Sequence, residues 1–229
     1  MRVFVNHLTR MAEDRICVAG IEAGGERHVR PITRRQDPLT RGLLKENGGP
    51  FALGALVDIR DARPTPTHPE TEDHWVWLDR LRAVGQLSPE QYLDLIDAHC
   101  EETLEGVFGS ALQRHGWTYA VDEGDGDASL GCLRPRRRPR LEVNDRGRLR
   151  LRLAEADAAA FLAVTDLRFF EADGDIRREL VEAVAARMRR GVPVRVMVGL
   201  GRAWAKEDGD QRHHWLQVNG ICLEDRPLG

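Results

Sequence analysis

The chain has 229 residues, of which 41% are hydrophobic and 31% charged, a balance that excludes a disordered chain and indicates a globular protein. Its formal net charge of −3 does not point to a polyanionic partner. No apolar stretch approaches the roughly 20 residues that cross a bilayer. The first ten residues lack a signal-peptide core, so we expect a cytoplasmic protein with no membrane partner.

The first 86 residues predict a small barrel of five strands. The β-like runs cover residues 3–8, 15–22, 28–33, 55–60 and 74–81. Gly24 and Gly25, between the second and third runs, are a hairpin signal. Residues 40–45 predict a short helical turn after the third run. Three strands, a helix and two strands is the element order of an OB barrel, a fold that mostly provides binding surfaces for nucleic acid, oligosaccharide or protein.

Residues 87–133 predict an acidic helical insert after this barrel. Ser88, Pro89 and Gln91 form a helix start, because serine caps the first turn, proline suits it and glutamine completes a capping box. Apolar residues then repeat every three to four positions, which predicts one buried stripe. Residues 122–127 are acidic and glycine-rich, which is typical of a loop or linker.

Charge changes abruptly where the insert ends. Residues 83–133 contain ten acidic residues and one basic residue, whereas residues 134–152 contain nine arginines and two acidic residues. The extended basic segment 134–140 is suited to following phosphates through charge alone, with strong salt dependence. The alternative is that the two blocks neutralise each other or are simply solvated.

The last third of the chain predicts a second barrel in the same order. Its β-like runs cover residues 140–144, 148–153, 161–169, 192–199 and 214–223. Between the third and fourth runs, apolar residues repeat every fourth position and predict an amphipathic helix over residues 175–190. Gly191 ends this helix, and we expect the helix to cover the bottom of a closed cylinder.

These elements indicate a protein that is mainly β with helices, in the α+β class. We expect two tandem OB-like β-barrels joined by a helical insert. The expected units are residues 1–86 for the first barrel, 87–133 for the acidic helical insert or linker, and 134–229 for the second barrel.

Short motifs at both ends of the chain resemble a known family. Near the start they are Val-Asn-His-Leu-Thr-Arg-Met at residues 5–11, Ile-Cys-Val-Ala-Gly-Ile at 16–21 and His-Val-Arg-Pro at 28–31. Near the end they are Val-Gly-Leu-Gly-Arg-Ala-Trp at 198–204, His-Trp-Leu-Gln-Val-Asn at 214–219 and Leu-Glu-Asp at 223–225. Together they resemble the dual OB-containing domain family of bacterial and archaeal modules, some of which are linked to conflict or defence systems. The resemblance implies tandem OB barrels and nucleic-acid binding, and it supplies no catalytic residues.

Two segments of the second barrel are candidate nucleic-acid contacts. Arg202 and Trp204 follow the fourth strand, where an arginine supplies charge and a tryptophan supplies a face for base stacking. Trp215, Gln217 and Asn219 alternate along the last strand and share one face, which would combine stacking with amide readout of a base edge. The alternatives are that Trp204 covers the barrel mouth and that Trp215 is buried between the barrels, with the amides bonded across that interface.

The first barrel offers a second candidate surface. His7 and Arg10 lie at the end of its first strand and Arg30 near the end of its third, so these groups are placed to converge at one rim and hold a phosphate. The alternative is that His7 and Arg30 satisfy buried neighbours. Trp75 and Trp77 share one face and are either a stacking platform or packing against the insert.

Metal and catalytic motifs are missing from the sequence. The four cysteines, at positions 17, 100, 132 and 222, form no Cys-x-x-Cys pair, so we expect buried free thiols. His213 and His214 are adjacent, and neighbouring residues on a strand point apart, which argues against a paired-histidine metal site. We therefore expect no metal, no cofactor and no catalytic residues.

The leading hypothesis is a non-catalytic module that binds single-stranded nucleic acid or RNA. A protein-interaction adaptor for an enzyme encoded nearby is the alternative, since OB barrels support both uses and fold does not determine function. A small-ligand sensor or enzyme that uses the polar rim of the first barrel is the third hypothesis.

Overall fold

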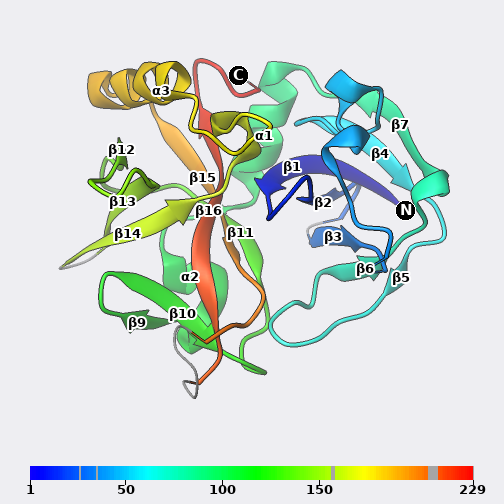
Figure 1. The fold of residues 1–229 in the computed structure, drawn as a ribbon, viewed down its shortest axis with the longest axis horizontal. Coiled ribbons are helices and arrows are strands. Elements are labelled where there is room, and N and C mark those ends of the chain that lie inside the picture. The colour runs from blue at the N-terminus through cyan, green and yellow to red at the C-terminus, as the bar shows by residue number, and fades with distance from the viewer. Residues whose placement is uncertain (26, 35, 156–157, 206–210, 229) are drawn as a thin grey trace.

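The computed structural model describes residues 1–25, 27–34, 36–155, 158–205 and 211–228. Within these parts the chain is mostly β with three α-helices, and its strands form two sheets that lie side by side (Figure 1). The mainly β, α+β class predicted from the sequence is confirmed. In the described residues, no helix combines the length and apolar character needed to cross a membrane.

The first sheet has the strand order β5-β6-β3-β2-β1-β4-β7. Its strands are β1 (Arg2–Arg10), β2 (Ile16–Glu22), β3 (His28–Ile32), β4 (Ala55–Ile59), β5 (Arg63–Pro64), β6 (Asp73–Trp75) and β7 (Leu81–Gln86). β3 pairs with β6 in parallel, while β4 pairs with β1 and β5 with β6 in antiparallel fashion. Only residues 60–62 separate β4 from β5, so the β5 edge of the sheet returns close to β4 and the sheet curls as in an OB fold.

The end of this barrel differs in detail from the prediction of one strand over residues 74–81. Residues Asp73–Trp75 form β6, a 3-10 turn covers Leu78–Arg80, and a separate strand β7 then pairs with the outer edge of β4. The predicted helical turn over residues 40–45 is a pair of 3-10 turns, Arg41–Leu43 and Lys45–Asn47. Alternating burial along β4 places Ala55, Val57 and Ile59 in the barrel core.

The second sheet has the strand order β12-β13-β14-β16-β15-β11-β8, and β10 and β9 extend it from β16. Its strands are β8 (Cys100–Glu101), β9 (Gln113–His115), β10 (Thr118–Asp122), β11 (Leu130–Leu133), β12 (Arg140–Val143), β13 (Leu149–Glu155), β14 (Ala158–Val164), β15 (Val194–Leu200) and β16 (His213–Leu223). β12, β13 and β14 form a meander, and β14 pairs with β16 in parallel, as the OB order requires.

The second sheet is a curled half-barrel and not the closed cylinder that we expected from its five predicted strands. Closure requires β15 to pair with β12, but β11 from the segment 87–133 occupies that edge of β15. All four residues of β11 are buried. This apolar strand therefore pairs with the otherwise open edge of β15 and also adds side chains to the core. Four strands, β8 to β11, thus come from the segment that the sequence analysis set apart as an insert.

Three helices complete the fold: α1 (Pro89–Ala98), α2 (Leu104–Phe108) and α3 (Arg178–Arg190). The capping box of α1 is confirmed, because the Ser88 hydroxyl accepts from the Gln91 amide and the Gln91 side chain accepts from the Ser88 amide. The predicted stop of α3 at Gly191 is also confirmed, with a left-handed backbone at φ 95°. The apolar side of α3 packs into the core of the half-barrel, next to β12.

The two sheets meet along β1 and β16, near the centre of Figure 1. The backbone amide of Arg10 donates to the carbonyl of Thr165 at 2.8 Å, which links β1 to the turn after β14. Farther along the junction, the buried carboxylate of Glu72 accepts from the amide and hydroxyl of Ser129 and from the amide of Leu130. Each half of the molecule therefore supplies hydrogen-bond partners for polar groups of the other half.

Candidate functional site

Arg202 is held by carboxylates of the first barrel. Its guanidinium donates to Asp73 Oδ2 at 2.6 Å and lies 3.1 Å from Glu70 Oε1. Asp73 also accepts from Arg30 Nε at 2.5 Å, and both Asp73 and Arg30 are buried. The structure thus brings together two arginines that the sequence assigned to different surfaces, and their charges face carboxylates.

The other two residues of the predicted first-barrel rim are engaged by different groups. Arg10 Nη1 donates to the carbonyl of Gly174, and its guanidinium lies 4.2 Å from the ring centroid of Phe170, so it packs against the second half. His7 is 1% exposed and lies beside His28. Burial, and to a lesser extent the nearby His28 and Arg30, holds the pKa of His7 well below its ordinary value. A shared phosphate-binding rim is not formed by His7, Arg10 and Arg30.

The predicted row on β16 divides into exposed and buried members. Trp215 is 8% exposed, and its indole nitrogen donates to the carbonyl of Trp204 at 3.3 Å. Asn219 is buried and accepts from the Thr165 hydroxyl at 3.3 Å, a contact within the second half and not across the interface between the barrels. Trp204 is 48% exposed and Gln217 is partly exposed. Only Trp204 and Gln217 of this group therefore offer substantial surface to a ligand.

A basic and aromatic surface that the sequence analysis missed lies on the outer side of β12, β13 and β14. Along β13 the leucines point into the core, so Arg150 and Arg152 point outward. Arg140 of β12 lies opposite Arg152, and Phe161 of β14 lies opposite it on the other side. The Arg152 guanidinium carbon is 5.7 Å from the Phe161 ring centroid.

Trp117 extends this surface from the β9–β10 hairpin. It is 70% exposed, and its ring meets Phe161 edge to face with centroids 5.9 Å apart. The amide of Phe161 donates to the carbonyl of Trp117 at 2.7 Å, so the hairpin continues the sheet beside β14. A large exposed indole thus lies against Phe161, the same ring that Arg152 approaches.

The surface is continuous with the exposed part of β16. Ala163 of β14 is in register with Gln217, so both lie on the same side of the sheet as Phe161. We call this surface the outer sheet face. Its members are Arg140, Arg150, Arg152, Phe161, Trp117, Gln217 and Trp204.

The arginines of the outer sheet face differ from those of the segment just before it. Arg134 and Arg136 pair with Asp97 and Glu102 of the acidic segment, so these two members of the basic block are neutralised. In contrast, Arg140, Arg150 and Arg152 form no ion pair with the residues that the structure describes. Partial burial, and to a lesser extent the neighbouring Arg148, lowers the pKa of Arg150.

Trp75 and Trp77 form a smaller aromatic site on the first barrel. Both are a little more than one-third exposed, and the guanidiniums of Arg63 and Arg80 lie 5.3 and 5.2 Å from the Trp77 ring centroid. Trp75, Trp77 and Arg63, with Arg34 and other residues, line a pocket of about 590 Å³. The arginines lie against the ring of Trp77, which leaves less of its surface open for stacking than Trp117 has.

Among the residues that the structure describes, two groups of side chains have the composition of metal ligands, although the sequence contained no metal-binding motif. One is His7, His28 and Cys132, and the other is His115, Asp122 and His213. In the second group, His213 finds partners from β9 and β10, while His214 points to the opposite side, as expected for adjacent residues on a strand. Each group joins residues from strands that are far apart in the sequence. The spacing of these residues along the chain therefore could not predict either group.

Comparison with known proteins agrees with this architecture. The family model of the dual OB-containing domain matches residues 7–221. No curated protein and no solved structure matches the chain. The family match covers most of the sequence, and both sheets carry the strand order of that fold. The chain therefore belongs to the dual OB-containing domain family.

Proposed function

We propose that this tandem OB-fold module binds single-stranded nucleic acid, with RNA included, across the outer sheet face. The observation that carries the proposal is that Arg152 lies against Phe161, which in turn contacts Trp117, while Arg150 and Arg152 form no ion pair among the described residues. In OB folds the surface of the second and third strands is the usual site for oligonucleotides, and these strands correspond to β13 and β14 here.

The chemistry of this face suits a single strand better than a duplex. Arginine donates two parallel hydrogen bonds to a phosphate, and an exposed aromatic ring stacks on a base whatever its sequence. A base in a duplex is already stacked on its neighbours, so the exposed indole of Trp117 offers it little. Gln217 and Trp204 extend the same face toward a second nucleotide.

The remaining residues of the sequence-based site have a supporting role in this proposal. Arg202 and Arg30 hold the two halves together through Asp73, and Arg10 packs on the second half. Trp215 and Asn219 brace β16 from below the surface. These contacts occupy the side chains within the protein, and His7 belongs to a different cluster.

A fluorescence-anisotropy titration tests the proposal with labelled single-stranded RNA, single-stranded DNA and the matching duplexes at several salt concentrations. The double variant Arg150→Gln/Arg152→Gln should weaken binding to single strands. It should also reduce the slope of log affinity against log salt by about 0.7 for each phosphate that the variant no longer neutralises. The matched control is Arg60→Gln/Arg82→Gln, which removes the same charge from exposed positions on the first barrel.

Three outcomes contradict the proposal. A wild-type protein that binds none of these oligonucleotides even at low salt excludes nucleic-acid binding. Equal weakening by the two double variants indicates a general charge effect in place of contacts on the outer sheet face. Tighter binding to duplexes than to single strands excludes the stacking mode.

A further inference from the structure

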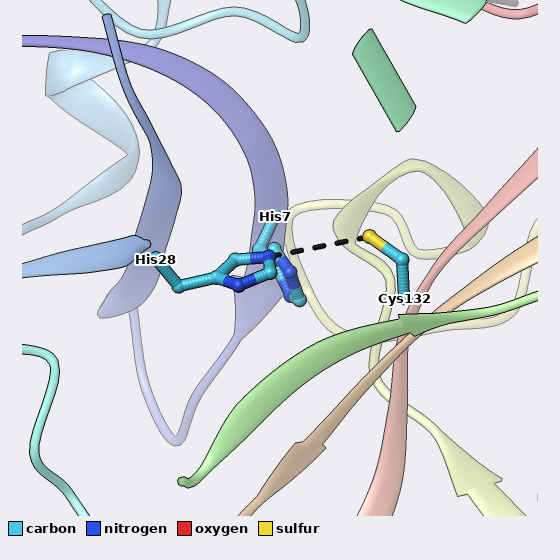
Figure 2. A group of neighbouring side chains, drawn as sticks. All are labelled: His7, His28 and Cys132. Carbon is cyan, nitrogen blue, oxygen red and sulfur yellow. Dashed lines mark hydrogen bonds between the residues drawn. The ribbon is translucent and has the colours of Figure 1, made fainter. Parts of the chain in front are cut away.

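His7, His28 and Cys132 converge at the junction of the two halves. They come from β1 and β3 of the first sheet and β11 of the second, and Figure 2 shows the three side chains directed toward one another. One ligand atom from each residue lies within 4.8 Å of the others, and His28 Nε2 is 4.0 Å from Cys132 Sγ. Two imidazoles and a sulfur in one place form a ligand set with affinity for thiophilic cations.

The hydrogen bonding of His7 points to a missing partner in this cluster. His7 is 1% exposed, and neither of its ring nitrogens has a hydrogen-bond partner among the described residues. A buried polar group without a partner is costly, and an imidazole nitrogen can be satisfied either by a donor or by a metal ion. A cation at the centre of the cluster would satisfy it.

Polar side chains and a cavity surround the cluster of His7, His28 and Cys132. The side-chain amide nitrogen of Asn6 donates to Cys132 Sγ at 3.6 Å, which holds the sulfur in place beside the two imidazoles. His99 Nδ1 donates to the carbonyl of Leu95 at 2.8 Å, which leaves its buried Nε2 as an acceptor. The His99 ring lies 6.4 Å from that of His28, beside a cavity of about 450 Å³ that His28 and Cys132 also line.

We propose that His7, His28 and Cys132 bind a zinc ion that joins the first barrel to the second sheet, with the fourth coordination position directed toward the cavity beside His99. Tetrahedral zinc, with bonds of about 2.0 Å to nitrogen and 2.3 Å to sulfur, holds ligand atoms about 3.5 Å apart, so these side chains need to close by about 1 Å. The cation would join segments far apart in the sequence and oppose separation of the halves.

The group of His115, Asp122 and His213 is the competing site. Its members are less buried, and His213 Nδ1 already lies 2.7 Å from Asp122 Oδ1. It contains no sulfur, so a bound cobalt ion reports directly which group is occupied. Only a cysteine ligand produces a thiolate-to-cobalt charge-transfer band.

The test uses the full chain without a histidine tag, first stripped with a chelator and then titrated with Co²⁺. We expect one equivalent to bind with tetrahedral visible bands and a charge-transfer band, and Zn²⁺ to displace it. The melting temperature should rise with Zn²⁺ and fall again when the chelator is restored. A protein that binds no Co²⁺ overturns the proposal, and so does binding without the charge-transfer band.

Variants assign the ligands. Cys132→Ser should abolish the charge-transfer band and the zinc-dependent rise in melting temperature. Cys222→Ser is the matched control, because Cys222 is equally buried and belongs to the same apolar cluster, and it should retain both. His7→Gln should weaken cobalt binding while His115→Gln leaves it unchanged. A charge-transfer band that persists in Cys132→Ser, or that disappears in Cys222→Ser, overturns the assignment.

Discussion

At the scale of the residue, exposure decides which aromatic side chains can meet a ligand. Trp117 is 70% exposed, whereas Trp215 is 8% exposed and already packed against Trp204. The sequence placed Trp215 on the correct side of its strand, because that depends only on alternation. It could not reveal the covering of Trp215 by distant side chains, or the position of Trp117 beside Phe161, because both follow from long-range contacts.

Replacing Trp117 should affect binding without affecting folding. Trp117→Ala removes an exposed indole, and one base stack contributes about 1–3 kcal/mol, so affinity for single strands should fall about 5- to 150-fold. Anisotropy titration measures the affinity, and urea unfolding should show a stability within about 0.5 kcal/mol of the wild type. Trp77→Ala is the control on the first barrel and should bind normally. Undiminished affinity in Trp117→Ala would remove Trp117 from the binding surface.

At the scale of the element, local sequence signals predicted the helices and most strands, but they could not predict which strands pair with one another. The capping box at Ser88 and the stop at Gly191 involve neighbours in the sequence, and both are confirmed. The pairing of β11 with β15 joins residues more than sixty positions apart, and it replaces the closure that the sequence predicted. The alternating Arg-Leu pattern of β13 was the available signal for Arg150 and Arg152.

Helix α1 is tied to the second sheet by one carboxylate. Asp97 accepts from Arg195 at 2.7 and 2.8 Å and from Arg134 at 2.8 Å, and the bonds from Arg195 and Arg134 hold the pKa of Asp97 below its ordinary value. The lowered pKa stabilises the fold above the unfolded-state pKa of about 4. This contribution is lost as pH falls through the lower folded-state value.

Asp97→Asn should therefore destabilise the protein by about 1.5–3 kcal/mol at neutral pH and by less under acid conditions. Urea unfolding at a series of pH values measures the difference. Asp94→Asn, an exposed carboxylate on the same helix, is the control and should change stability little. A deficit in Asp97→Asn that does not shrink toward low pH would show that the charge of Asp97 is not responsible.

At the scale of the whole molecule, the two halves share buried polar groups as well as a strand contact. Asp73 of the first barrel accepts from Arg30 of its own half and from Arg202 of the other. Composition and motifs predicted two OB barrels, but not that the acidic residues after β5 would enter the junction. Such charge pairing depends on how the halves pack, which no local pattern encodes.

Asp73 should accordingly be a determinant of the stability of the entire chain. Asp73→Asn leaves the buried guanidinium of Arg30 without its charged partner, and breaking a buried pair in this way costs about 3–5 kcal/mol. The melting temperature should fall in a single transition that involves both halves, followed by circular dichroism and tryptophan fluorescence. Asp61→Asn breaks the exposed pair with Arg80 and should cost at most about 1 kcal/mol. Equal losses in the two variants, or a transition confined to one half, would show that Asp73 does not couple the barrels.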